Sequence, residues 1–261
     1  MANKNNLSSS LVVEFLGTAL LIGAQIGAGY SLSGLAQIGI PQMVTFGIAI
    51  VSAFALAIAI TMGGAISGGH FNPAVTIALA LTKNAPVARV FPYIVAQLGG
   101  AFVAAVLTNF MWAGTTVTSV AGSAPTTSAF ISELLATGVL VGIVVTMVRR
   151  NGGQGLNWLV PAWVGTAIFL TPTGCMANPA VTFGHMFTGS LTGVAVEAAP
   201  SFIGIQLVAA LLVAGVTVFL APKAVAKAAP AAAAKPTAVA KPAAAKPVAR
   251  KAPAKKAVAK K

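Results

Sequence analysis

Asn-Pro-Ala occurs twice in the chain, at Asn72-Pro73-Ala74 and at Asn178-Pro179-Ala180, and Val-Thr follows each copy. Asn is a favoured helix N-cap and Pro is favoured at the first helical position, so each copy predicts the start of a helix. Both copies lie in apolar surroundings, and lipid cannot satisfy the free N–H groups of a helix start. We therefore expect both starts to line a protein-walled cavity. If they face each other, they form a pore.

The composition indicates a chain that crosses a membrane several times. Hydrophobic residues make up 57% of the 261 residues and charged residues 7%, and the mean hydropathy is +0.90, which is typical of polytopic membrane proteins. Three acidic residues, two histidines and one cysteine leave little for acid–base catalysis, metal binding or disulfides. The sequence predicts no enzyme, no metal site and no cofactor.

Six apolar stretches approach the length of about 20 residues that a helix needs to cross a bilayer. They are residues 11–30, 42–64, 87–112, 128–148, 156–171 and 200–220. The two Asn-Pro-Ala copies follow the second and fifth stretches, and each opens an apolar run of only about ten residues, too short to cross alone. We predict an all-α membrane protein with six transmembrane helices and two re-entrant half helices.

The two halves of the chain resemble each other. A glutamate, Asn-Pro-Ala and a Gln-Leu pair recur in the same order, the glutamates at Glu14 and Glu133 and the pairs at Gln97-Leu98 and Gln206-Leu207. Because each half has three spans, the second half must be inverted in the membrane relative to the first. The prediction is an inverted 3+3 repeat around a central pore, with repeats at about residues 11–112 and 128–220.

Basic residues fall on alternate connections and predict the orientation. Lys or Arg residues precede the first span, separate the second from the third, and follow the fourth and sixth spans. Both termini are therefore predicted to be cytoplasmic. We divide the chain into a cytoplasmic N-terminus (1–10), a channel domain (11–220) and a Lys/Ala/Pro-rich cytoplasmic tail (221–261).

The tail holds eleven of the sixteen Lys and Arg residues, all within residues 223–261, and no acidic residue. Its frequent prolines disfavour a stable helix and predict a disordered segment. Three alternatives remain open: a solvated extension without a specific partner, binding to anionic lipid headgroups, and nonspecific binding to nucleic acid or another polyanion. In the last case the spans would serve as a membrane anchor for the tail.

The inverted repeat brings Asn72 and Asn178 together near the bilayer centre. Each side-chain oxygen can cap its own helix while the amide N–H₂ points into the lumen as a donor. A water between two such donors must present its oxygen to them, so it cannot relay a proton, and the converging positive helix ends repel cations. Water or a small uncharged solute is the cargo that this arrangement permits.

The chain resembles the major intrinsic protein family, the aquaporins and aquaglyceroporins, over roughly residues 11–220. The segment Ile66-Ser-Gly-Gly-His-Phe-Asn-Pro-Ala-Val-Thr76, the second Asn-Pro-Ala and the two repeated glutamates carry the resemblance. It implies six spans with two half helices, a pore in each subunit and a homotetramer in the lipid bilayer. The compact loops and the lack of processing signals predict a bacterial plasma membrane. The implied function is a passive channel for water and small uncharged solutes, with a glycerol facilitator as the alternative.

The selectivity region departs from the family's usual pattern. Val181 stands three positions after the second Asn, where the family usually has Arg. The spacing carried over from the two Asn residues places the other constriction positions near Ser52 or Phe54, at Thr166 and at Cys175. None of these is the His typical of strict water channels. We expect a less polar and wider constriction, and the sequence leaves both the preferred solute and the strictness of proton exclusion open.

Carboxylates inside spans suggest proton coupling, so a proton-coupled transporter using Glu14 and Glu133 is a further alternative. We favour a structural role, in which each glutamate accepts backbone N–H bonds and braces a half-helix loop. The resemblance implies that role, and no other intramembrane charge is present for a relay.

Three residues of the half-helix loops are further candidates. Cys175 lies where the family's loop backbone lines the pore, so its thiol is a target for mercurials; a buried, inert filler is the alternative. Gly69 and His70 belong to the first pore loop. We expect His70 to pack in the loop and to form hydrogen bonds on the pore side, because a metal would need partner ligands that are absent.

Overall fold

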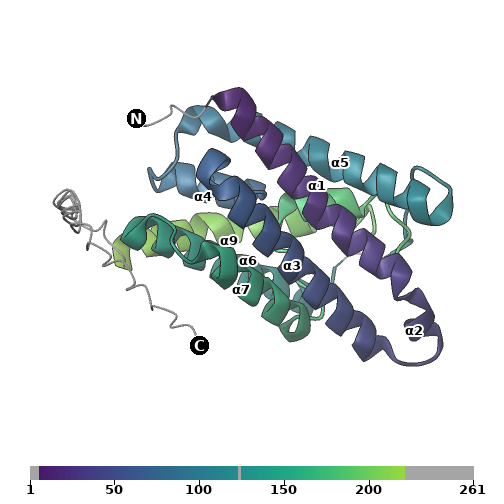
Figure 1. Cartoon of the computed structure of the whole chain (residues 1–261). Coiled ribbons are helices and arrows are strands. Elements are labelled where there is room, and N and C mark those ends of the chain that lie inside the picture. Colours follow the sequence, from purple (N-terminus) through teal and green to yellow (C-terminus); the bar gives the residue numbers. More distant parts are fainter. Residues whose placement is uncertain (1–5, 123–124, 221–261) are drawn as a thin grey trace, which may run out of the picture. The chain divides into compact units, whose positions relative to one another are not determined.

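The computed structural model describes residues 6–122 and 125–220, and every regular element in these ranges is a helix (Figure 1). Five helices are long and apolar enough to cross a membrane: α1 (Leu7–Ser31), α3 (Pro41–Ser67), α5 (Val90–Ala113, preceded by the 3-10 turn Val87–Arg89), α6 (Thr127–Asn151) and α9 (Ala199–Leu220). The sixth apolar helix, α7 (Leu156–Leu170), has 15 residues. The six predicted spans are therefore confirmed as helices, and the fifth is the shortest.

The two half helices are α4 (Pro73–Leu81) and α8 (Pro179–His185), and each begins at the Pro of an Asn-Pro-Ala copy. Nine and seven residues extend about 14 and 11 Å at 1.5 Å per residue, too little to cross a bilayer. The predicted fold class is confirmed. The sequence did not predict the short helix α2 (Ser33–Gln37) between the first two spans.

Each half helix packs against spans of the other half of the chain. Half helix α4 contacts α9 and α6 as well as α5, and α8 contacts α5 and α1 as well as α9. The long helices also pair closely, α1 with α5 and α3, α3 with α7, and α6 with α9 (Figure 1). The two halves therefore interlock around the point where α4 and α8 meet.

The outward faces of the long helices are apolar. Large exposed hydrophobic side chains include Leu16 on α1, Phe54 on α3, Phe110 on α5, Ile131 on α6 and Phe219 on α9. A soluble protein of this size seldom exposes apolar surface on every long helix, whereas a lipid-facing protein does. The protein is a multi-pass membrane protein. The predicted tail (221–261) and residues 1–5 lie outside the described residues, so the domain boundaries there stay predictions.

Gly100 sets the closest approach between α1 and α5. A Cβ atom at this position would overlap the backbone carbonyl oxygen of Phe15, which cannot move without shifting α1. Small residues at helix crossings let backbones approach in lipid, where packing contacts replace the hydrophobic effect.

We expect Gly100→Ala to destabilise the folded protein in detergent by about 1–3 kcal/mol, because overpacking forces backbone shifts. The thermal unfolding midpoint, followed by loss of the folded size-exclusion peak, measures the effect. Gly204→Ala on α9 is the control, since nothing lies within 4 Å of an added Cβ there, and it should leave the midpoint unchanged or raise it. Equal midpoints for the two variants would contradict this account of the α1–α5 crossing.

Candidate pore and its selectivity region

Both Asn-Pro-Ala asparagines cap their half helices. Asn72 is extended (φ −156°), and its Oδ1 accepts a hydrogen bond from the backbone N–H of Ala74 at 2.9 Å. Asn178 has nearly the same conformation (φ −159°), and its Oδ1 accepts from the N–H of Ala180 at 2.9 Å. These are the capping bonds that the residue types favour.

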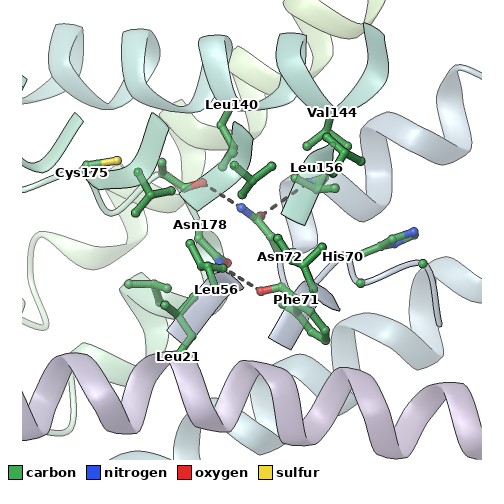
Figure 2. A pocket seen from close by; sticks show the side chains of 18 of the residues that line it. Leu21, Leu56, His70, Phe71, Asn72, Leu140, Val144, Leu156, Cys175 and Asn178 are labelled. Atoms are coloured by element: carbon green, nitrogen blue, oxygen red, sulfur yellow. Dashed lines mark hydrogen bonds between the residues drawn. The ribbon is translucent and has the colours of Figure 1, made fainter. Parts of the chain in front are cut away.

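The two asparagines also hold each other's loops. Nδ2 of Asn72 donates to the carbonyl oxygen of Ala177, and Nδ2 of Asn178 donates to the carbonyl oxygen of Phe71, both at 2.9 Å (Figure 2). A carboxamide has two N–H donors, so one per asparagine remains for a solute. Both asparagines line the central cavity. The sequence analysis placed the amides toward the lumen but did not foresee this reciprocal bond.

The residues before the two asparagines adopt left-handed backbone conformations, with φ of 49° at Phe71 and 46° at Ala177. Residues other than Gly seldom adopt such angles, and where these angles persist the surrounding contacts enforce them. Here the carbonyl oxygen of each residue accepts the bond from the opposite asparagine. Two residues further back, Gly69 (φ 65°) corresponds to Cys175 (φ 57°), so the loops share one backbone path.

Glu14 is fully buried and accepts four hydrogen bonds. Its Oε1 accepts from the Ser67 hydroxyl at 2.6 Å and from the His70 N–H at 3.0 Å, and its Oε2 accepts from the Phe71 N–H at 2.7 Å and from Nε2 of Gln97 at 2.8 Å. The carboxylate therefore accepts hydrogen bonds from the backbone N–H groups of the irregular loop between α3 and α4.

Glu133 makes the matching set in the second half. Its Oε1 accepts from the Thr173 hydroxyl at 2.6 Å and the Met176 N–H at 3.1 Å, and its Oε2 accepts from the Ala177 N–H at 2.8 Å and Nε2 of Gln206 at 2.7 Å. Neither glutamate lines any of the three cavities described below. This geometry favours bracing over proton coupling.

Three cavities follow one another through the channel domain. A central cavity of about 60 Å³ lies between two larger ones of about 530 and 480 Å³. We call these the outer and the inner cavity, after the orientation predicted from the basic residues. Apolar side chains from α1, α3, α6 and α7 form much of the central wall, among them Val160, Val164 and, labelled in Figure 2, Leu21, Leu56, Leu140 and Val144. The path is therefore narrow and apolar where the two asparagine amides lie.

Residues that line two cavities mark the necks between them. Gln25, Cys175, Met176 and Val181 line both the central and the outer cavity, and we call them the outer neck. The inner neck comprises the residues shared by the central and inner cavities: Ile60, Gly68, His70, Leu79, Val148 and Leu156.

The predicted selectivity residues do not all meet. Cys175 and Val181 lie in the outer neck, and Ser52 is buried, its Oγ accepting a hydrogen bond from Nε2 of Gln25 at 3.1 Å. Phe54, however, is 67% exposed, and the exposed Thr166 donates a hydrogen bond to the backbone of its own helix. The placement of Phe54 and Thr166 at the constriction was therefore wrong.

Helix rotation explains this error. Helix α7 turns Val160, Val164 and Ile168 toward the cavities at four-residue spacing. Thr166 lies two positions from Val164, about 200° around the helix at 100° per residue, and so points away. The number of residues between Thr166 and Asn178 does not determine which side of α7 faces the pore. The sequence analysis also missed Gln25, although a Gln one helical turn after Leu21 in an apolar span was a visible signal.

His70 lies in the inner neck, and Thr76 holds its ring. Its Nδ1 is 3.1 Å from the Thr76 hydroxyl oxygen, and that hydroxyl donates its own hydrogen to the carbonyl of Asn72. Gly69 also lines the central cavity. Within residues 6–122 and 125–220, no group of three His, Cys, Asp or Glu side chains could hold a metal ion.

Two half helices whose N-termini meet inside a bundle of apolar spans define a membrane channel of the aquaporin type. The sequence profile of the major intrinsic protein family matches residues 1–176, and the chain belongs to this family. The match ends before Asn178. The evidence for the second half of the pore is therefore the geometry of Asn178 and α8 given above. The protein is accordingly a passive membrane channel.

Curated relatives and a solved structure agree with this assignment. The chain is 28% identical to the aquaglyceroporin AqpS of Rhizobium meliloti over 205 residues, which cover 78% of this chain and 87% of the relative. It is 31% identical to the propanediol uptake facilitator PduF of Salmonella typhimurium over 214 residues, 70% and 80% of the two chains. The X-ray structure of the Plasmodium falciparum aquaglyceroporin has the same fold, with a TM-score of 0.60 at 24% identity, over 81% of this chain and 93% of that chain.

The equivalent bonding of the two glutamates yields a prediction. Glu14→Gln and Glu133→Gln should each destabilise the protein by about 1–3 kcal/mol, because the new amide N–H₂ is placed against backbone donors. Thermal unfolding in detergent measures both, with the same change at the exposed Glu197 as control. A Glu14→Gln variant of unchanged stability that has lost transport would instead favour a coupling role.

Cys175 is the one cysteine of the chain, and it lines the central and outer cavities. An organomercurial should therefore block solute flux, since a thiol adduct fills the narrow outer neck. Cys175→Ala should conduct and resist the reagent. Block of the Ala variant, measured by light scattering from proteoliposomes, would show that the reagent acts elsewhere.

Proposed function

We propose that the protein conducts water and small uncharged solutes such as glycerol, with the paired amides of Asn72 and Asn178 as the donors at the centre of the path. The main observation behind the proposal is that the amides of Asn72 and Asn178 both line the central cavity. One N–H per asparagine is engaged by the opposite loop, so the other is available to a passing oxygen. A water that accepts from both amides points its hydrogens away from them and cannot pass a proton across this point.

The walls of the path favour neutral cargo. None of the residues that line the three cavities is an Asp, Glu, Lys or Arg. An ion entering the apolar central cavity would lose its hydration shell without meeting an opposite charge, which is costly. A neutral solute loses far less.

The outer neck supports passage of solutes larger than water. Val181 is buried there, and a valine is shorter than the arginine usual in the family and carries no charge. Three relatives are named for such cargo: the aquaglyceroporin AqpS, the glycerol uptake facilitator of Escherichia coli, and the propanediol uptake facilitator of Salmonella typhimurium. These names support a glycerol-permeable channel for this chain.

We further propose that the channel is a homotetramer with a pore in each subunit and with both termini in the cytoplasm. The basic residues Arg149 and Arg150 lie in the last turn of α6, close in sequence to residues 152–157, which line the inner cavity. Positive charge on short connections favours the cytoplasmic side. The exposed apolar faces of the long helices supply surface for lipid and for neighbouring subunits.

The first experiment is stopped-flow light scattering of proteoliposomes, shrunk with an impermeant osmolyte and then with glycerol. We expect faster shrinkage than in empty vesicles with the first and rapid re-swelling with the second. Re-swelling no faster than in empty vesicles would restrict the cargo to water. No acceleration of either phase would overturn the proposal.

Val181→Arg tests the role of the outer neck. The larger, charged side chain should narrow the neck and lower glycerol permeability about tenfold relative to water permeability, because pore diameter and lining charge set selectivity. Val181→Thr keeps the volume and is the control, with a ratio expected within about twofold of the wild type. If Val181→Arg left the ratio unchanged, the outer neck would not be the selective point.

A further inference from the structure

The outer neck contains one carboxamide. Of its four residues, Cys175, Met176 and Val181 offer at most a weak sulfur donor or acceptor, whereas Gln25 offers two N–H donors and a carbonyl acceptor. Gln25 reaches this point from the C-terminal third of α1, a helix that otherwise presents Leu21 to the central cavity.

The amide of Gln25 is held in place but not fully bonded. The side chain is 5% exposed, and its Nε2 donates to Oγ of Ser52 on α3 at 3.1 Å. Oε1 has no hydrogen-bond partner among the described residues. A buried carbonyl without a partner is costly, so such groups call for an explanation.

Gln97 and Gln206 provide a useful comparison, because their Oε1 atoms also lack partners. Those two glutamines hold Glu14 and Glu133 through Nε2, and neither lines a cavity. Gln25 differs in that it contacts no glutamate and stands at the solute path. Bonds to the bracing glutamates therefore account for Gln97 and Gln206, whereas Gln25 is held by Ser52 and borders the cavities.

The internal repeat supports the same distinction. Glu14 matches Glu133 across 119 positions, and the same spacing pairs Gln25 with Val144, which also lines the central cavity. A purely structural position would accept an apolar residue in the first half, as it does in the second. At this pair of positions, a polar side chain therefore occurs in the first half of the chain alone.

We propose that Gln25 is a specificity-determining residue of the outer neck, which binds small neutral solutes that carry a hydroxyl or amide N–H donor. Oε1 is enclosed in this structure and has no partner, so we infer that a small shift of the side chain turns it toward the solute, where it accepts a hydrogen bond. The remaining N–H of Nε2 can donate to a solute oxygen. A guanidinium can only donate and is always charged, whereas a carboxamide is neutral and can do both. The inference rests on the proposed passage of small neutral solutes and names the residue that selects them.

The test compares Gln25→Met with wild type in proteoliposomes, because Met keeps the length of the side chain and removes its hydrogen-bonding groups. Glycerol and urea permeability are each divided by water permeability measured on the same vesicles. The loss of one hydrogen bond to the solute should lower both ratios about fivefold. Gln37→Met is the control, since Gln37 is exposed and lines none of the three cavities, and its ratios should equal those of the wild type.

Wild-type ratios for a Gln25→Met protein that elutes like the wild type would overturn the inference. If Gln25→Met does not assemble, Ser52→Ala decides the question, because it releases the anchor of the amide and leaves Gln25 in place. Its ratios should fall about twofold, and unchanged ratios would overturn the inference. A wild-type protein that passes no glycerol or urea would refute the proposed function instead, so the two failures are distinguishable.

Discussion

Irregular backbone inside a membrane needs a protein partner for every polar group, and this requirement governs the whole channel domain. The loops 68–72 and 174–178 interrupt the helical hydrogen-bond ladder at membrane depth, where lipid offers no donors or acceptors. Glu14 and Glu133 each accept two backbone N–H bonds from one loop. The asparagine amides then occupy one carbonyl from the opposite loop. Without these six bonds the two half helices could not begin at the central cavity.

The same bonds explain why the loops tolerate unfavourable backbone angles. Phe71 and Ala177 are held at positive φ by the glutamate that accepts from their N–H and the asparagine that donates to their carbonyl. Each residue is fixed from both sides of its peptide unit, and strain of this kind persists only where neighbours over-determine it. Phe71 is also buried against Gly17 and Gly63 of the spans α1 and α3. Loop geometry and helix packing therefore depend on each other.

Much of this architecture could be predicted from residue order because its causes are local. Apolar length predicts the spans, and the Asn-Pro pair predicts where each half helix begins, since capping depends on neighbouring residues. The necks could not be predicted in the same way. Cys175 and Val181 were found because they lie close in sequence to Asn178, whereas Phe54 and Thr166 failed because the facing side of a long helix depends on its rotation. Gln25 meets Val181 across more than half of the chain, and no local rule joins them.

A nearly symmetric scaffold therefore carries an asymmetric path. The bracing glutamates, the capping asparagines and the glutamines behind them repeat in both halves, and these groups hold the backbone. The necks do not repeat: the outer neck presents the amide of Gln25 beside Val181, and the inner neck presents the imidazole of His70 among apolar side chains. The scaffold repeats because both loops need hydrogen-bond partners for their backbone groups, whichever side of the membrane they enter from. Selection needs only one narrow point with the right polar groups, so side chains at the necks can change while the interlocked half helices stay in place.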